Sequence, residues 1–250
     1  MEEPTRQNLN QPSQTAKFSL PDSLDILKES WLIYKKRIKT FLGITIIPTL
    51  VTIVLMALIM GTAFFNPSLI NTNPEETFMG AFSFWTAIMF FIAILIQIWS
   101  QAALIFAIKD SQEGIGIKES YKRASSKIVS FIWVSFLTWI IVFAGFMFFI
   151  IPGIIFALWF CFSALIVIDE NIKGTQAILK SKEYVQGMMG AIFWKFLFIT
   201  FVILALAIIA ALFSGGLLTP IVSFLATPFA VIYYFLVYKK VKEIKSAKQY

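Results

Sequence analysis

Three polar side chains lie inside one of the long apolar stretches of this sequence: Gln97, Ser100 and Gln101. Their spacing of three and four residues places them on one face of a helix. Amides and hydroxyls at such a position can hydrogen-bond an uncharged solute, a lipid headgroup or the polar groups of a neighbouring helix. The sequence leaves open whether this intramembrane polar cluster lines a cavity or only joins two helices.

Cationic side chains form the second set of residues that could act chemically. They flank the apolar stretches, within segments whose apolar residues recur at helical spacing. An amphipathic helix with a basic face can lie in the headgroup plane of a membrane and attract anionic lipids. Alternatively, these residues are only the solvated flanks of membrane spans. The predicted headgroup contacts are Lys28, Lys35, Lys36, Lys118, Lys122, Arg123 and Lys180.

Groups that support most enzymatic chemistry are missing from the sequence. It contains no His and one Cys, so it lacks the usual neutral-pH base, the commonest metal ligand and an intramolecular disulfide. Cys161 lies in an apolar run, where we expect it to pack as a small hydrophobic group. We expect Asp169 and Glu170 to start a helix or to pair with Lys173. The sequence therefore predicts a protein that is not an enzyme and that binds no cofactor or metal.

The composition indicates a membrane protein. Of the 250 residues, 58% are hydrophobic and 14% are charged, whereas soluble domains have about 25% charged residues. So few charges cannot cover the surface of a soluble globule. The net charge of +7 could indicate nucleic-acid binding, but the basic residues flank the apolar stretches and form no soluble basic face. We expect membrane lipids as partners, anionic ones included, and no nucleic acid.

Charge-free stretches long enough to cross a bilayer predict six transmembrane helices. In the first stretch, the helix at 40–65 is ended by Asn66-Pro67. The last two stretches are each divided by a turn signal, Pro152-Gly153 in one and Ser214-Gly215-Gly216 in the other, so each predicts a tight hairpin of two spans. The four charge-free stretches are residues 40–74, 77–108, 128–168 and 196–238.

The positions of the basic residues predict the orientation of these spans. All 21 Lys and Arg residues lie in four regions. These are the segment before the first span, the loop between the second and third spans, the loop between the fourth and fifth spans together with the start of the fifth, and the segment after the sixth span. The opposite ends of the predicted hairpins have none. Because cytoplasmic loops carry an excess of Lys and Arg, we predict that both termini are cytoplasmic. The protein would then be integral to the cell membrane, either plasma or inner.

A similar segment precedes each odd-numbered span, and the three segments align without gaps on Ser30, Ser120 and Ser181. In the first segment, the predicted apolar stripe consists of Leu24, Leu27, Trp31, Tyr34 and Ile38. We infer three copies of one unit, in which a cytoplasmic amphipathic interfacial helix precedes a transmembrane hairpin. The predicted fold class is thus an all-α polytopic membrane protein with six transmembrane helices arranged as three hairpins.

The predicted domain organisation is a single six-helix membrane domain at 21–238. A polar, Pro- and Gln-containing segment at 1–20 predicts a disordered cytoplasmic tail. The last residues, 239–250, predict a basic cytoplasmic tail. The three repeat units within the membrane domain cover residues 22–108, 115–168 and 175–238.

Several short motifs carry a resemblance to a known family. They are Leu27-Lys28-Glu29-Ser30-Trp31, Tyr34, Pro152-Gly153, Glu170, Ala177-Ile178-Leu179-Lys180-Ser181, Gly187, Pro228 and Tyr238. With these residues the chain resembles the membrane domain family found with glycerophosphoryl diester phosphodiesterases and related six-span bacterial membrane proteins. In that family the phosphodiesterase chemistry belongs to a separate soluble domain, for which we expect no room here. The resemblance therefore implies the fold and the membrane location, and no catalytic residue.

Two functional hypotheses follow from these features. The favoured one is a non-enzymatic integral membrane protein that engages lipids or scaffolds membrane components at the cytoplasmic face. The alternative is a transporter or channel for a lipid-like or neutral solute, with Gln97 and Gln101 facing a cavity. Glutamines that face a water-filled vestibule would favour the alternative, and glutamines that pair with a neighbouring helix would count against it.

Overall fold

The computed structural model describes residues 20–65 and 84–248, and these residues form helices without strands. Within these ranges, six helical segments are long and apolar enough to cross a membrane, which confirms the predicted all-α polytopic fold. The expectations for the N-terminal tail, for Asn66-Pro67 and for the start of the second span fall in residues 1–19 and 66–83. These lie outside the described residues, as do residues 249–250.

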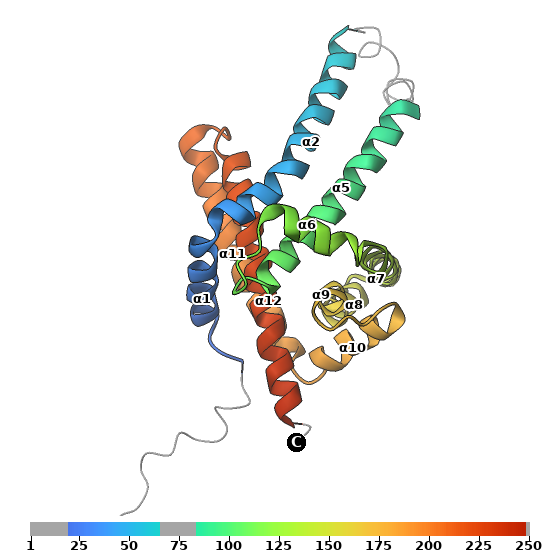
Figure 1. The fold of residues 1–250 in the computed structure, drawn as a ribbon, viewed down its shortest axis with the longest axis vertical. Coiled ribbons are helices and arrows are strands. Elements are labelled where there is room, and N and C mark those ends of the chain that lie inside the picture. The colour runs from blue at the N-terminus through green and yellow to red at the C-terminus, as the bar shows by residue number, and fades with distance from the viewer. Residues whose placement is uncertain (1–19, 66–83, 249–250) are drawn as a thin grey trace, which may run out of the picture.

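The first unit consists of a short helix and a long hairpin. Asp22 caps the start of the short helix, since its carboxylate accepts a hydrogen bond from the backbone N–H of Ser23 at 2.7 Å. The two long helices lie side by side and project to one end of the molecule (Figure 1). The elements are α1 (Ser23–Lys36), α2 (Ile38–Phe65) and α5 (Phe84–Lys109).

The second unit turns at a different place from the one predicted. Pro152-Gly153 does not form the turn, because the chain reverses at Phe149, whose extended backbone separates two helices (φ −163°, ψ 157°). Pro152 lies in the first turn of the second of these helices, where its missing N–H costs no helix hydrogen bond. The elements are α6 (Ile117–Ser125), α7 (Ile128–Phe148), α8 (Ile150–Trp159) and α9 (Ser163–Asp169).

The third unit follows the sequence prediction closely. Its turn is at the predicted position, since the fifth span ends at Ser214 and Gly215 caps it in the left-handed region (φ 58°), which glycine adopts at little cost. The last helix continues through the predicted basic tail as far as Lys248. The elements are α10 (Thr175–Val185), α11 (Met189–Ser214) and α12 (Thr219–Lys248).

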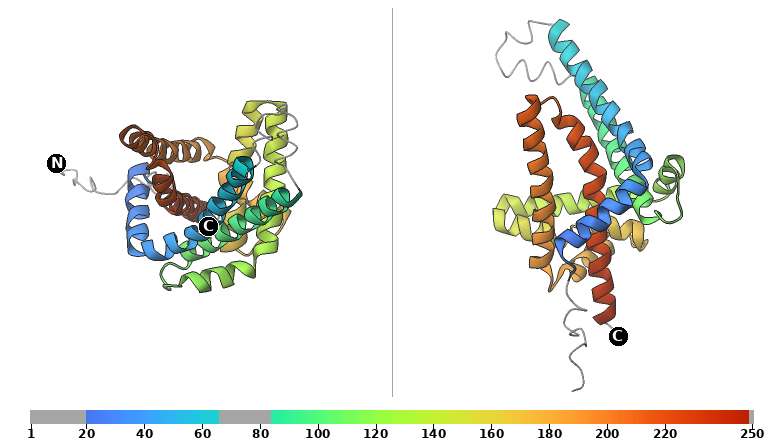
Figure 2. Two further views of the ribbon diagram at one scale, coloured as in Figure 1. Left: turned by 90° about the horizontal axis from the view of Figure 1, so that it is seen from above. Right: turned by 90° about the vertical axis from the view of Figure 1, so that its left-hand side faces the viewer.

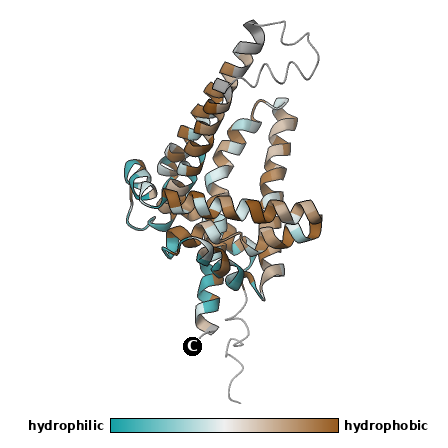
Figure 3. Ribbon diagram, turned by 90° about the vertical axis from the view of Figure 1, so that its right-hand side faces the viewer, coloured by the Kyte–Doolittle hydropathy of each residue, from teal (hydrophilic) through white to brown (hydrophobic). Residues whose placement is uncertain are grey.

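The three hairpins do not share one direction. The hairpins α2–α5 and α11–α12 extend towards the same end of the molecule, whereas α7–α8 lies across them and is viewed end-on in Figure 1 (Figures 1 and 2). Apolar residues cover the long helices and the crosswise hairpin, and polar residues gather around α6 and near the C-terminus (Figure 3). We call the end that carries α6, α10 and the C-terminal turns of α12 the polar end.

The buried core lies near the polar end. It is formed by residues 102–108 of α5, residues 165–168 of α9 and most of residues 232–241 of α12. The opposite halves of the long helices have many exposed apolar side chains, which is what a bilayer would cover. Helix α1 packs against α12, and α6 packs against α5, so the short helices hold the long ones at this end.

The short helices bury a face that differs in part from the predicted stripe. The aligned residues Ser30, Ser120 and Ser181 are all fully buried. In α1, Tyr34 of the predicted stripe is buried, whereas Leu24 and Trp31 are about half exposed, at 52% and 54%. The face that packs against the rest of the protein is built from Ile26, Ser30 and Tyr34, four residues apart, so Leu24 and Trp31 point outwards beside the lysines.

Candidate functional site

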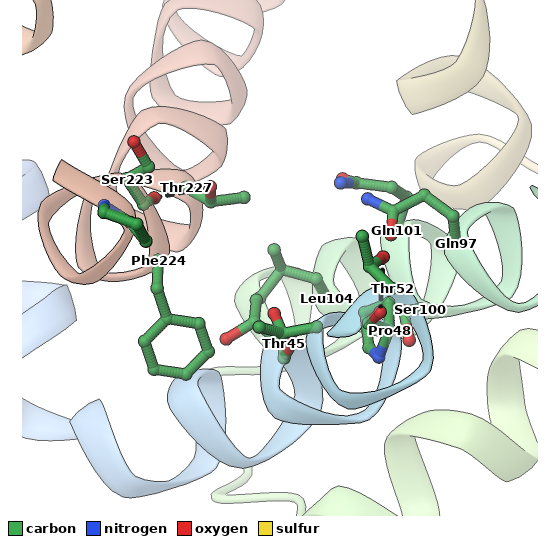
Figure 4. A pocket seen from close by; sticks show the side chains of 12 residues that line it. Thr45, Pro48, Thr52, Gln97, Ser100, Gln101, Leu104, Ser223, Phe224 and Thr227 are labelled. Atoms are coloured by element: carbon green, nitrogen blue, oxygen red, sulfur yellow. Dashed lines mark hydrogen bonds between the residues drawn. The ribbon is translucent and has the colours of Figure 1, made fainter. Parts of the chain in front are cut away.

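A cavity of about 270 Å³, lined in part by polar side chains, lies between α2, α5 and α12. It includes all three residues of the predicted intramembrane polar cluster, and none of the described residues that line it is charged. Figure 4 shows the cavity, with side chains from the three helices directed into it. The lining residues are Thr45, Pro48, Thr49, Thr52, Gln97, Ser100, Gln101, Leu104, Pro220, Ser223, Phe224 and Thr227.

The glutamines of α5 face this cavity. The side chains of Gln97 and Gln101 extend from α5 towards Thr227 of α12 (Figure 4), and no described residue supplies a hydrogen bond to either amide. Gln101 lies eight residues before Lys109 in a continuous helix, a rise of about 12 Å, and Gln97 about 18 Å. The two amides therefore lie within the candidate span, on either side of Ser100, and have no hydrogen-bond partner there among the described residues.

Threonine hydroxyls line the α2 side of the cavity. Each donates its proton to the backbone of its own helix, from Thr49 to the carbonyl of Thr45 at 2.8 Å and from Thr52 to that of Pro48 at 2.9 Å. Thr227 does the same across the cavity, to the carbonyl of Ser223 at 2.8 Å. These bonds use the hydroxyl protons, so the hydroxyl oxygens remain available as acceptors.

Along α2 and α5 the cavity is enclosed at one end and open at the other, and the α12 residues that line it are more exposed. Thr45, Ser100 and Leu104 are buried and form its closed end, whereas Gln97 and Thr52 are exposed at its mouth. Along both α2 and α5, the closed end is the one nearer the basic flanks of the helices, Lys39 and Lys109. The cavity thus opens away from the polar end of the molecule.

A proline in α2 leaves one backbone carbonyl without a helix partner, and a tyrosine of α6 hydrogen-bonds to this carbonyl. Pro48 has no N–H, so the carbonyl of Ile44, four residues earlier, has no helix partner. The hydroxyl of Tyr121 on α6 donates to this carbonyl at 3.0 Å and also contacts the Ser100 hydroxyl. Because the single phenol proton goes to Ile44, Ser100 is the donor to Tyr121. Burial raises the pKa of Tyr121 more than the Ser100 hydrogen bond lowers it, so the phenol keeps its proton.

A tyrosine from α1 makes a similar contact to the other helix with an internal proline. The hydroxyl of Tyr34 donates to the carbonyl of Leu225 at 3.1 Å, in the turn before Pro228 of α12. A proline ring disturbs the helix hydrogen bonds of the preceding turn, so its carbonyls are available to outside donors. The tyrosines of α1 and α6 therefore fasten the two helices that contain prolines on either side of the cavity.

Most of the predicted lipid-contact lysines lie free on the surface of α1 and α6. Lys35, Lys36, Lys118 and Lys122 are exposed and have no ion pair with any described residue. Lys28 is exposed as well, and its distance to the equally exposed Asp25 is 4.0 Å. Lys180 on α10 is half-buried and lies over the ring of Tyr184, with 5.6 Å from its nitrogen to the ring centroid.

Arg123 differs from the other predicted contacts because three carboxylates surround it. Its guanidinium donates to Asp110 at 2.5 Å, to Glu113 at 2.9 Å and to Glu119 at 3.3 Å. The hydrogen bond to Asp110, followed by that to Glu113, raises the pKa of Arg123 above its usual value. The positive charge of Arg123 is thus balanced within the protein, unlike the charges of Lys118 and Lys122 on the same helix.

A second polar cluster involves the acidic pair, which does not start a helix or pair with Lys173. Asp169 ends α9, and its side chain is 4% exposed. It binds the ammonium groups of Lys239 at 2.7 Å and Lys242 at 2.6 Å, both on α12. Glu170 accepts hydrogen bonds from Tyr184 at 2.8 Å and from Tyr238 at 2.7 Å. Burial, followed by the hydrogen bond to Glu170, raises the pKa of Tyr184.

The sequence prediction found one wall of the cavity and missed the other two. The missed residues are the threonines of α2 at spacings of four and three, and Ser223 with Thr227 at a spacing of four on α12. Hydroxyl residues at helical spacing inside a charge-free stretch are a signal that could have found them. No feature of the sequence indicates that these walls face Gln97 and Gln101, because that depends on how distant helices pack.

No known protein family, curated protein or solved structure matches this chain. The resemblance to the membrane domain family therefore remains a prediction.

Proposed function

We propose that this integral membrane protein engages anionic lipids through the outward faces of α1 and α6 and that it organises membrane components at that surface, without enzymatic activity. The observation that carries the proposal is a contrast among the basic residues. Lys35, Lys36, Lys118 and Lys122 are exposed and free among the described residues. Arg37 and Lys109, by comparison, donate to backbone carbonyls inside the protein.

The composition of the outward face of α1 supports this proposal. Lys28 and Lys35 share that face with Leu24 and Trp31, whose side chains are about half exposed. Tryptophan and leucine beside lysine suit the membrane interface, where apolar side chains enter the acyl boundary and ammonium groups meet phosphates. Each lysine close to an anionic surface contributes about 1 kcal/mol.

Lipid co-purification tests the proposal. We expect the quadruple variant Lys28→Gln, Lys35→Gln, Lys118→Gln and Lys122→Gln to lose its enrichment of anionic over zwitterionic lipid, by about fivefold for each site. The matched control replaces the same four lysines by Arg and keeps the charge, so its enrichment should stay. Mass spectrometry of lipids retained by the purified protein gives the readout. Equal enrichment in the Gln and Arg variants would refute the proposal.

A second candidate function is passage of a neutral or lipid-like solute. The observation that favours it is that Gln97 and Gln101 face the cavity and have no hydrogen bond to a neighbouring helix in the described ranges. The lack of charged residues in the described lining suits an uncharged solute, because an ion would find no opposite charge there. The candidate is thus independent of the lysine surface.

A further inference from the structure

We infer that the cavity between α2, α5 and α12 is a binding site for an uncharged group that carries hydroxyls, either the headgroup of a neutral lipid or a free polyol. The inference rests on the cavity named for the second candidate function and gives the chemical class of its ligand. It does not depend on the lysine surface.

The hydrogen-bonding groups of the cavity select this chemistry. The hydroxyl oxygens of Thr49, Thr52 and Thr227 have used their protons on backbone carbonyls, so towards the cavity they only accept. The amides of Gln97 and Gln101 can both donate and accept. A ligand that fits both walls must donate to the threonines and accept from the glutamines, and a hydroxyl group does both.

The uncharged lining of the cavity disfavours charged ligands. None of the described residues that line it is charged. A phosphate or an ammonium group would have to leave water without an ion partner, which costs several kcal/mol. An uncharged hydroxyl group can instead hydrogen-bond to the glutamine amides, which have no partner among the described residues or in an apolar membrane. Its binding then removes the free-energy cost of leaving those amides unpaired.

The shape of the cavity supports a ligand that enters from the open end. The buried closed end, at Thr45, Ser100 and Leu104, lies towards the polar end of the molecule. Tyr121 fixes α6 to α2 and α5 just behind this end through the carbonyl of Ile44 and the hydroxyl of Ser100. A headgroup can therefore reach the glutamines from the mouth, where Gln97 and Thr52 are exposed.

Binding of two probes tests the inference. The purified protein, in a zwitterionic detergent without hydroxyls, is titrated with 1-monooleoylglycerol and, separately, with glycerol, and native mass spectrometry and thermal unfolding record binding. We expect saturable binding of at least one probe. The double variant Gln97→Leu and Gln101→Leu should weaken it by tenfold or more, since each lost hydrogen bond contributes about 1 kcal/mol. Binding of monooleoylglycerol alone identifies a lipid headgroup, and binding of glycerol identifies a free polyol.

The controls separate this inference from the two proposed functions. Gln176→Leu makes the same chemical change on the exposed surface of α10 and should leave binding unchanged. Thr49→Val, which keeps the side-chain shape, should weaken binding even if the glutamine variant folds poorly. Lys118→Gln and Lys122→Gln should have no effect on either probe. If a probe binds but glycerol does not cross the membrane of proteoliposomes, the proposed transport function is wrong, whereas the inferred binding site stands.

Three results would overturn the inference. The first is that neither probe binds at concentrations where both remain soluble. The second is that a probe binds equally well to the wild type and to the variants at Gln97, Gln101 and Thr49. The third is that dioleoylphosphatidic acid, an anionic lipid, binds more tightly than monooleoylglycerol and loses this binding in the glutamine variant, because the cavity would then accept a charge.

Discussion

At the scale of single residues, hydroxyl groups and buried ions connect segments that are far apart in the sequence. Each short helix contributes one tyrosine hydroxyl: Tyr34 binds α12, Tyr121 binds α2, and Tyr184 binds Glu170 after α9. Asp169 is a second example, since its carboxylate binds two lysines of α12 that lie about 70 positions later in the chain. These contacts hold the helices together at the polar end of the molecule.

Replacement of Asp169 tests the strength of this connection. We expect Asp169→Asn to lower the free energy of unfolding by about 2 kcal/mol, because Lys239 and Lys242 lose a charged partner that is buried. The effect stays below that of a fully buried pair because the two lysine side chains are 35% and 28% exposed, which lets water screen the charges. Unfolding by sodium dodecyl sulfate in mixed micelles measures the difference.

The matched control for this prediction is Asp25→Asn on α1. Asp25 pairs with Lys28 at 4.0 Å, and both side chains are mostly exposed, at 67% and 77%. We expect a change of less than about 0.5 kcal/mol for this variant. An equal loss of stability in both variants would show that the buried ion pairs of Asp169, at the junction of α9 and α12, stabilise the protein no more than the exposed pair of Asp25.

At the scale of elements, the crosswise hairpin α7–α8 depends on two glycines that let its helices touch. A Cβ atom on Gly145 would lie 2.6 Å from the ring of Phe156 and 3.1 Å from the Cα atom of Gly153. A Cβ atom on Gly153 would lie 2.4 Å from the ring of Phe146. The second contact of Gly145 is to backbone, which cannot move away as a side chain can. Small residues at helix contacts are a common means of close packing in membranes.

We expect Gly145→Ala to lower the free energy of unfolding by about 1 to 3 kcal/mol, since the added methyl group forces α7 and α8 apart. Gly190→Ala in α11 is the control, because a Cβ atom there has no neighbour within 4 Å and its φ is not positive. It should be neutral or slightly stabilising, as alanine favours helix more than glycine does. Thermal unfolding in detergent compares the two, and equal stability would contradict the role of Gly145 as a contact point.

At the scale of the whole molecule, one prediction concerns which ends of the helices share a compartment. The sequence predicts every Lys and Arg on one side of the membrane, and the structure places α10 and the C-terminal turns of α12 at one end, with α6 beside the base of α2. The turn between α11 and α12, with Leu217 82% exposed, lies away from this end (Figure 2). We therefore expect the basic flanks to face the cytoplasm and the α11–α12 turn to face the exterior.

Labelling of intact cells with a membrane-impermeant maleimide tests this orientation. In a Cys161→Ala background, Lys118→Cys and Lys173→Cys should react only after the cells are permeabilised, because both side chains are exposed on the side predicted to be cytoplasmic. Leu217→Cys should react without permeabilisation and serves as the positive control. Reaction of Lys118→Cys in intact cells would reverse the predicted orientation, and reaction of only one of the two lysine variants would divide the basic residues between compartments.

The sequence by itself determined the parts of this protein that depend on local composition and spacing. Long charge-free stretches predict the candidate spans, and the glycines after Ser214 predict a turn that the structure confirms. The spacing of Gln97, Ser100 and Gln101 identifies one polar face. These features need no knowledge of distant partners, because apolar helices, their ends and their polar faces follow from neighbouring residues.

Only the tertiary structure decided which distant segments of the chain contact one another. Pro152-Gly153 predicts a turn from the sequence, but the chain reverses at Phe149, and Pro152 lies inside α8, whose Gly153 packs closely against α7. Likewise, the threonines of α2 and the glutamines of α5 become two walls of one cavity only when α12 closes the third side. The direction of the α7–α8 hairpin and the partners of Asp169 are also set by contacts between residues far apart in the chain, which local patterns do not encode.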